Sequence, residues 1–287
     1  MYFCVNCFVN YINEIMIKRI THLLAFILFT SFFAGCLQVE TTLKVEKDGS
    51  GTINEKVLFS KTFVKMIKDF TEAFQDSGST EEFTLFETDD IKADAKNYGE
   101  NVKYVSHELV SNDNWEGYQA IYSFNDITKV QISPDPDSKV ALDDQTTETE
   151  KEEYYFFKFV KGDTPQLIIN RPDIDELSAD TDEYDELEQT EQTNEEENEE
   201  FIKMMEGMKI DIAVEVEGEI VNTNATYVQG SKITLFEMNL TEMMKNKEVF
   251  KEFKKNEPNN IEEMKQYLEK LPGLKIEVEK PITITFK

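Results

Sequence analysis

The chain is poor in the side chains that most enzymes use for nucleophilic and metal chemistry. It has three cysteines, all within the first 36 residues, so no disulfide framework can hold the rest of the chain together. Of its two histidines, His22 and His107, the first lies in an apolar leader and the second in a predicted strand, where a structural role is expected. No G-x-S-x-G serine occurs, and the glycines of Asp48–Gly51 lack the lysine and helix of a phosphate-binding loop. We therefore expect no enzymatic activity and no cofactor.

Basic side chains are also scarce. The 30 Lys and Arg residues face 58 Asp and Glu residues, which gives a formal net charge of −28. A surface of this sign repels phosphate backbones, so nucleic acid is excluded as a partner. Long-range attraction would instead favour cations or basic partners.

Clusters of acidic side chains suggest a calcium-binding site, but the spacing of the acidic residues does not fit a calcium-binding loop. The Asp180–Glu186 cluster lacks the glycine and the final glutamate of an EF-hand. Asn112–Gly117 has the glycine, but Ser123 stands where the bidentate glutamate belongs. We interpret the first as a solvated acidic segment and the second as a turn between strands, and we predict no metal site.

What the chain does have is a leader. Lys18 and Arg19 are followed by an apolar run, Leu23–Ala34, which has the length of a signal peptide and is short for a membrane span. The run ends at Phe33–Cys36, which resembles the bacterial lipobox with phenylalanine in place of the commoner leucine. Residues 1–35 are therefore predicted to be a lipoprotein signal peptide, with Cys36 as the lipid attachment site; the alternative is an uncleaved anchor helix.

The residues before the leader do not fit a signal peptide. Met16 directly precedes the basic residues and is the predicted start of translation, so Cys4 and Cys7 are not interpreted as a redox or zinc pair. Several acyl chains on Cys36 would anchor the protein durably, at about 0.8 kcal/mol for each buried CH₂ group.

Beyond Cys36, the pattern indicates strands joined by hairpins and mixed with several helices. Alternating residues predict a hairpin on either side of Lys47–Gly51, and apolar positions at helical spacing predict a helix after Ser60. The expected fold is antiparallel α+β, with several packed helices and with the first and last strands side by side. Further helices are expected over 89–98, 199–208, 239–255 and 258–271, and one final strand over 274–286.

One stretch differs in composition from the rest. Pro172–Glu200 holds 15 acidic residues and no Lys or Arg, which indicates disorder because it cannot bury enough apolar surface. We expect 36–171 and 199–287 to form a single domain, with 172–198 as a disordered acidic insertion. Two small domains are the alternative.

Two turns resemble a known family. They are Asp48–Gly51, soon after the lipobox cysteine, and Gly218–Ala225, which is followed by Gly230 and a strand. Together they resemble the LppM-like family of mycobacterial envelope lipoproteins. The resemblance implies a non-catalytic envelope lipoprotein related to glycolipid-binding proteins, and it transfers no binding residue.

Two functions remain open at this point. The first is a lipid-anchored lipoprotein of the cell envelope, in the outer membrane if the bacterium has one, that binds a lipid or another amphiphile. Dense Phe and Met positions, such as Phe63, Phe70 and Met204–Met208, would then line an adaptable apolar groove, although an ordinary core is the simpler explanation for them. The alternative is a structural or assembly lipoprotein that docks a partner protein.

Overall fold

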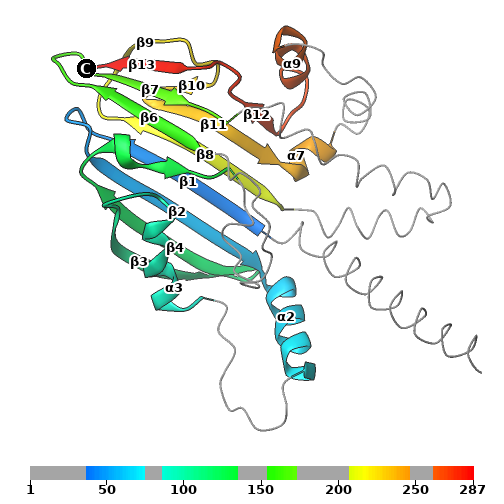
Figure 1. The fold of residues 1–287 in the computed structure, drawn as a ribbon. Coiled ribbons are helices and arrows are strands. Elements are labelled where there is room, and N and C mark those ends of the chain that lie inside the picture. Colours follow the sequence, from blue (N-terminus) through cyan, green and yellow to red (C-terminus); the bar gives the residue numbers. More distant parts are fainter. Residues whose placement is uncertain (1–36, 75–85, 135–153, 173–206, 246–260) are drawn as a thin grey trace, which may run out of the picture.

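A computed structural model describes residues 37–74, 86–134, 154–172, 207–245 and 261–287 (Figure 1). Strands predominate, and they form two sheets. The large sheet has the order β10-β11-β8-β1-β2-β4-β3, with β12 also paired to β11, and the small sheet has the order β5-β6-β7-β13-β9. The strands of the large sheet are β1 (Leu37–Val45), β2 (Gly51–Ser60), β3 (Lys103–Ser111), β4 (Trp115–Phe124), β8 (Lys209–Val216), β10 (Val228–Gln229), β11 (Lys232–Asn239) and β12 (Leu274–Ile276). Those of the small sheet are β5 (Gln131–Ile132), β6 (Tyr155–Val160), β7 (Gln166–Asn170), β9 (Ile220–Thr223) and β13 (Ile282–Phe286).

The expected fold class, α+β with several packed helices, is wrong: the molecule is mostly β. The described helices are α2 (Lys61–Phe74), α3 (Thr88–Ala93), α7 (Leu240–Met244) and α9 (Ile261–Leu268), with short 3-10 turns η1 (Asp94–Lys96) and η2 (Ile127–Lys129). The helical patterns at 89–98 and 258–271 give shorter helices than expected, and most of those at 199–208 and 239–255 lies outside the described residues. The spacing of apolar residues overstated the extent of the helices. Such spacing does not distinguish a long packed helix from a short turn that connects two strands of the core.

Local patterns nevertheless placed several elements correctly. The hairpin about Lys47–Gly51 is confirmed, with Leu37 opposite Phe59 at one end and Val45 opposite Gly51 at the other. The helix after Ser60 is confirmed too, and the Ser60 hydroxyl caps it by accepting a hydrogen bond from the Phe63 amide at 3.2 Å.

The last strand was predicted wrongly. The segment expected as one strand over 274–286 is two: β12 pairs with β11 in the large sheet, and β13 lies between β7 and β9 in the small one. Pro281, which has no amide hydrogen to donate to a neighbouring strand, lies between the two strands. The first strand, β1, therefore does not lie beside the last; it lies between β2 and β8.

The pairing of β1 with β8 joins parts of the chain on either side of the acidic stretch. The two strands run parallel, with Gln38 opposite Lys209 and Val45 opposite Val216. Residues 1–36, which include the predicted signal peptide and Cys36, and 173–206, which include most of the predicted insertion, lie outside the described residues.

One hydrophobic cluster unites the two sheets. It contains alternate residues of β1 and β2, such as Leu43 and Ile53, together with Leu167, Ile169 and Ile284 of the small sheet, all fully buried. The inner faces of the two sheets therefore pack against each other, as in a sandwich. A second, smaller cluster lies under α7, α9 and β12 and consists of Met243, Leu268, Leu271, Leu274 and Val278.

Candidate functional site

Among the residues singled out from the sequence, those that the structure describes do not come together in a site. Cys36 and the Asp180–Glu186 cluster lie outside the described residues. His107 lies on β3, where its Nδ1 is 2.6 Å from the Tyr104 hydroxyl. The Asn112 side-chain oxygen accepts hydrogen bonds from the Asn114 and Trp115 amides at 3.0 Å each, so it builds the β3–β4 turn. Among the described residues, no group of three or more His, Cys, Asp or Glu is arranged to hold a metal ion.

The Phe and Met positions that suggested an apolar groove are part of the core wherever they are described. Phe63 of α2 stacks on Phe59 with ring centroids 5.4 Å apart, and both side chains are buried. Met208 and Met243 are buried as well. Phe70 and Met204 lie among residues whose side chains or placement are not described. An apolar groove therefore finds no support among the described side chains.

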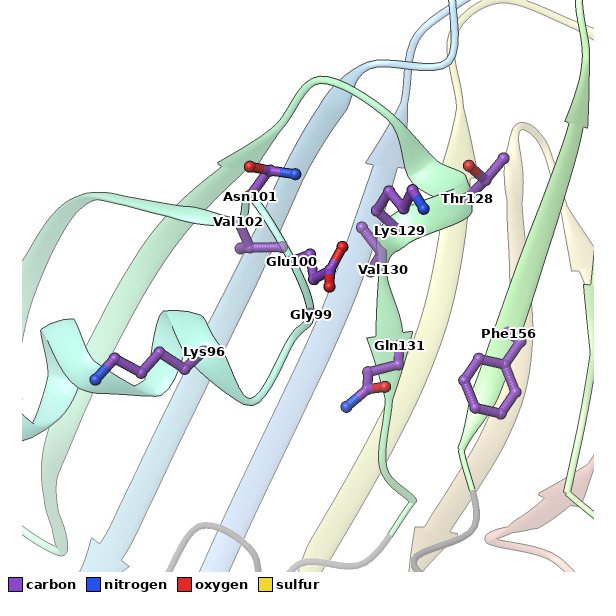
Figure 2. Close-up of a pocket in the computed structure, with 10 residues that line it drawn as sticks. All are labelled: Lys96, Gly99, Glu100, Asn101, Val102, Thr128, Lys129, Val130, Gln131 and Phe156. Atoms are coloured by element: carbon purple, nitrogen blue, oxygen red, sulfur yellow. The ribbon is translucent and has the colours of Figure 1, made fainter.

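The structure instead shows a cleft that the sequence did not indicate. It has a volume of about 730 Å³ and opens between the loop after η1, the η2–β5 segment and β6 (Figure 2). Its wall combines polar and apolar residues and includes one large aromatic ring, Phe156, which is 50% exposed. The lining residues are Lys96, Gly99, Glu100, Asn101, Val102, Thr128, Lys129, Val130, Gln131 and Phe156.

Backbone contacts hold the two rims of the cleft together. Gly99 forms an isolated antiparallel bridge with Val130, and the Gln131 amide donates to the Tyr98 carbonyl at 2.9 Å. Gly99 has φ +117°, and a Cβ there would lie 2.1 Å from the Lys129 carbonyl oxygen, so glycine is required for this close approach. Gln131 lies opposite Phe156 on the neighbouring strand, and the two side chains lie side by side in Figure 2.

A buried polar cluster, the Glu55–tyrosine cluster, lies beneath this region. Glu55 of β2 is fully buried and accepts a hydrogen bond from the Tyr98 hydroxyl at 2.6 Å. It also accepts longer ones from Tyr122 at 3.3 Å and Tyr118 at 3.4 Å. Tyr122 further donates to the Ile91 carbonyl at 2.9 Å, so the cluster ties α3 and the cleft loop to the large sheet.

Burial raises the pKa of the Tyr98, Tyr118 and Tyr122 hydroxyls well above the ordinary value of 10.0, and the charge of Glu55 raises it further. These groups therefore stay protonated and act as hydrogen-bond donors. Glu55 has its donors inside the protein and lies behind the cleft wall, so the cluster positions the cleft loop and offers no group to a ligand.

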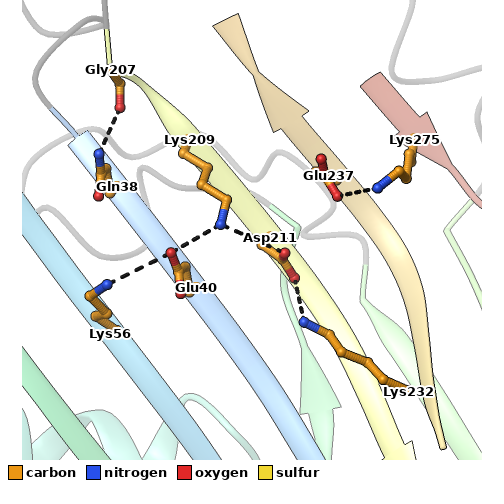
Figure 3. Close-up of polar contacts among 9 residues, drawn as sticks. All are labelled: Gln38, Glu40, Lys56, Gly207, Lys209, Asp211, Lys232, Glu237 and Lys275. Carbon is orange, nitrogen blue, oxygen red and sulfur yellow. Dashed lines mark hydrogen bonds and ion pairs between the residues drawn. The ribbon is translucent and has the colours of Figure 1, made fainter. Parts of the chain in front are cut away.

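The outer face of the large sheet carries alternating charges across four strands (Figure 3). Lys209 Nζ lies 3.0 Å from Glu40 and 3.9 Å from Asp211, while Lys56 and Lys232 flank the pair at 3.8 and 3.6 Å. Burial by itself would raise the pKa of Glu40, but the hydrogen bond from Lys209 and the nearby lysine charges lower it below 4.5. For Asp211, burial outweighs the lysines and raises the pKa.

Comparisons with known proteins identify no family for this chain. No family model matches the sequence, and no curated protein matches it. Among solved structures, the folded domain of the LppM protein of Mycobacterium tuberculosis is similar, with 10% sequence identity and a TM-score of 0.31 over 72% of this chain and 85% of that one. A likeness of this size assigns no function.

The cleft could not be found from the sequence because its walls come from segments that are distant along the chain. The available signals were Gly99, which directly follows the helix expected over 89–98, and the outward position of Phe156 in an alternating strand. Among the residues that the structure describes, none of the helices is long and apolar enough to cross a membrane.

Proposed function

We propose that the chain is a non-enzymatic lipoprotein of the bacterial cell envelope, anchored through acylated Cys36, and that it docks a partner protein at the cleft beside Phe156. The lipobox-like Phe33–Cys36 supports the anchor. The cleft is open and is lined by six polar or charged residues around one exposed phenylalanine, and this is the observation that supports docking over amphiphile carriage.

A carrier of lipid chains needs an apolar cavity of several hundred Å³. The cleft beside Phe156 is of that size, but six of its ten lining residues carry Lys, Glu, Asn, Gln or Thr side chains, and the others are one glycine, two valines and one phenylalanine. The interior that could have held an acyl chain is filled by fully buried side chains, among them Leu43, Leu167 and Ile284. An exposed aromatic ring surrounded by polar groups is instead typical of protein interfaces.

The absence of catalysis is part of the same proposal. Three described acids are buried: Asp211 pairs with Lys209 and Lys232 on the large sheet, and Glu55 and Glu277 are engaged inside the protein. Glu55 accepts from tyrosine hydroxyls, and Glu277 accepts from the Thr226 and Glu279 amides. Neither residue lines the cleft.

Anchoring is tested by Cys36→Ser. The variant is expected to leave the membrane fraction, since the acyl chains would have no attachment site. Continued membrane partitioning of Cys36→Ser would contradict the anchor and leave the uncleaved helix as the explanation.

Docking is tested by photo-crosslinking in cells, with the reactive amino acid at Phe156 and, as a matched control, at Val221 in the same sheet, which is 52% exposed. We expect a discrete protein adduct at position 156 that is absent at 221 and disappears when Lys129→Glu is added. Equal labelling at both positions would refute docking. Native mass spectrometry that finds a lipid of fixed mass on the purified protein would favour the amphiphile carrier instead.

A further inference from the structure

The domain leaves almost no tether between itself and the predicted lipid. Leu37 follows Cys36 directly, is the first residue of β1, and is only 5% exposed. Successive Cα atoms are about 3.8 Å apart, so the acylated residue lies within one residue of the sheet. The end of the large sheet that contains Leu37 therefore cannot move far from the lipid headgroups.

The strand register defines which other residues lie at this end. Leu37 is opposite Phe59, and Ser60 is opposite Trp115. The Lys61 amide, the first of α2, donates to the Asn114 carbonyl at 2.9 Å. We call Leu37, the first nine residues of α2 (61–69) and Trp115 the anchor end; α2 projects from this end of the sheet in Figure 1.

The exposed side of α2 is basic. Lys61, Lys65 and Lys68 follow one another at i, i+4 and i+7, which places them on one side of a helix. Phe63, Val64 and Ile67 are buried on another side. Three lysines within nine residues are unusual in a chain of net charge −28. Two exposed acids lie nearby: Asp69 within the anchor end and Asp113 in the β3–β4 turn beside it.

The cleft lies at the opposite end of the sheet. The Ile127 amide at the start of η2 donates to the Gly49 carbonyl in the β1–β2 turn at 2.9 Å. The adjacent residues Thr128 to Gln131 form one wall of the cleft. From Leu37 to Val45, β1 makes eight steps of about 3.3 Å, so the two ends are about 26 Å apart.

We propose that the anchor end lies against the bilayer surface, with Lys61, Lys65 and Lys68 contacting the phosphate groups of anionic lipids, and that the opposite end holds the cleft away from the membrane. The proposal rests on the proposed lipid anchor. Clustered lysines next to an anchor are attracted to an anionic lipid surface, and a single point of attachment combined with a basic helix fixes orientation as well as position.

Trp115, the single tryptophan of the chain, reports on the orientation directly. The full-length lipidated protein is incorporated into phosphatidylcholine vesicles that contain phosphatidylglycerol and a dansyl-labelled headgroup lipid. Energy transfer from Trp115 to dansyl is compared with transfer in Trp115→Phe/Lys47→Trp, where the tryptophan lies in the β1–β2 turn at the far end. We expect transfer from position 115 to be several-fold more efficient. Equal transfer, or more efficient transfer from position 47, would overturn the orientation.

The lysine contacts are tested by Lys65→Glu/Lys68→Glu, two exposed positions whose replacement removes no buried packing. Transfer from Trp115 is expected to fall toward the value at the far end. The matched control is Lys47→Glu/Lys161→Glu, which makes the same charge change at exposed positions of the far end and should leave transfer unchanged. If the α2 variant and the control behave alike, the lysines do not contact the lipid.

Failure of the orientation is distinguishable from failure of the anchor. If the chain is not acylated, the unmodified protein and its Cys36→Ser variant distribute identically between vesicles and supernatant. If it is acylated but differently oriented, the protein sediments with vesicles and only the transfer comparison fails.

Discussion

The Glu55–tyrosine cluster makes a quantitative prediction about stability in alkali. The cluster contains three tyrosines that are each less than 5% exposed: Tyr98, Tyr118 and Tyr122. Burial is the larger cause of their raised pKa, which lies above 10.0, and the charge of Glu55 is the second cause. In the unfolded chain they titrate near pH 10. Because their folded pKa is the higher one, their stabilising contribution is fully present below pH 10 and is lost as the pH rises above it.

The size of the effect follows from the linkage between protonation and folding. At pH 11, each tyrosine that ionises only in the unfolded chain lowers the free energy of unfolding by about 1.4 kcal/mol. The three cluster tyrosines together account for about 4 kcal/mol, a large part of the roughly 5–15 kcal/mol that stabilises a typical domain. Tyr155 and Tyr227 also have raised pKa values and add to the loss.

Comparison of variants isolates the cluster. Urea unfolding at pH 8 and pH 11 is followed by Trp115 fluorescence in the unmodified protein and in Tyr98→Phe/Tyr118→Phe. The variant is less stable at both pH values because Glu55 loses two donors. Its additional loss between pH 8 and pH 11 should nevertheless be smaller by about 3 kcal/mol, since two titrating groups are gone.

A packing variant serves as the control. Phe157→Leu removes buried aromatic volume without touching a titrating group, so it should lower stability equally at pH 8 and pH 11. If the unmodified protein and the double tyrosine variant lose the same free energy between the two pH values, the hydroxyls ionise freely in the folded state. The description of the cluster as buried would then be refuted.

Three further perturbations test the sheets and the short helix α7. Gly117→Ala places a Cβ 2.0 Å from the Val57 carbonyl oxygen, so urea unfolding should show a loss of at least about 1–3 kcal/mol; unchanged stability would contradict the register of β2 and β4. Glu40→Gln should cost less than about 1 kcal/mol at pH 7, because the ion pair with Lys209 is partly exposed. Since the pKa of Glu40 is lowered below 4.5, this difference should shrink as the pH falls below 4.5, and a difference that grows on acidification would argue against the ion pair. Asn239→Ala removes the side-chain cap of α7 and should cost about 1 kcal/mol in thermal or urea unfolding, whereas Asn239→Asp should retain the cap.

The sequence predicted those parts of the fold that depend on neighbouring residues. The β1–β2 hairpin and the helix after Ser60 depend on turn and capping side chains within a few positions, and both elements were predicted. The parallel contact between β1 and β8 and the division of 274–286 between two sheets depend on partners far along the chain. Alternation of polar and apolar residues shows that a strand has an inner face, but it does not show which strand lies beside it.

The candidate site was less predictable for the same reason. No sequence motif marks the cleft residues Gly99, Gln131 and Phe156. Only the tertiary fold brings them together in one cleft. Glu55 was indistinguishable from other acids in an acidic chain, because its burial among three tyrosines depends on strand pairing across 43 to 67 residues.

The position of β1 would have a consequence for folding if the protein is exported as proposed. Its β2 neighbour is available at once, but β8 begins more than 160 residues later in the chain, so one side of the central strand stays unpaired until most of the protein has emerged. Contacts of such sequence separation slow folding and leave strand edges open to other chains. A chain anchored at Cys36 would spend that interval at the membrane surface with β1 exposed, so its maturation is expected to depend on chaperones outside the cytoplasm and to fail by aggregation when export outpaces folding.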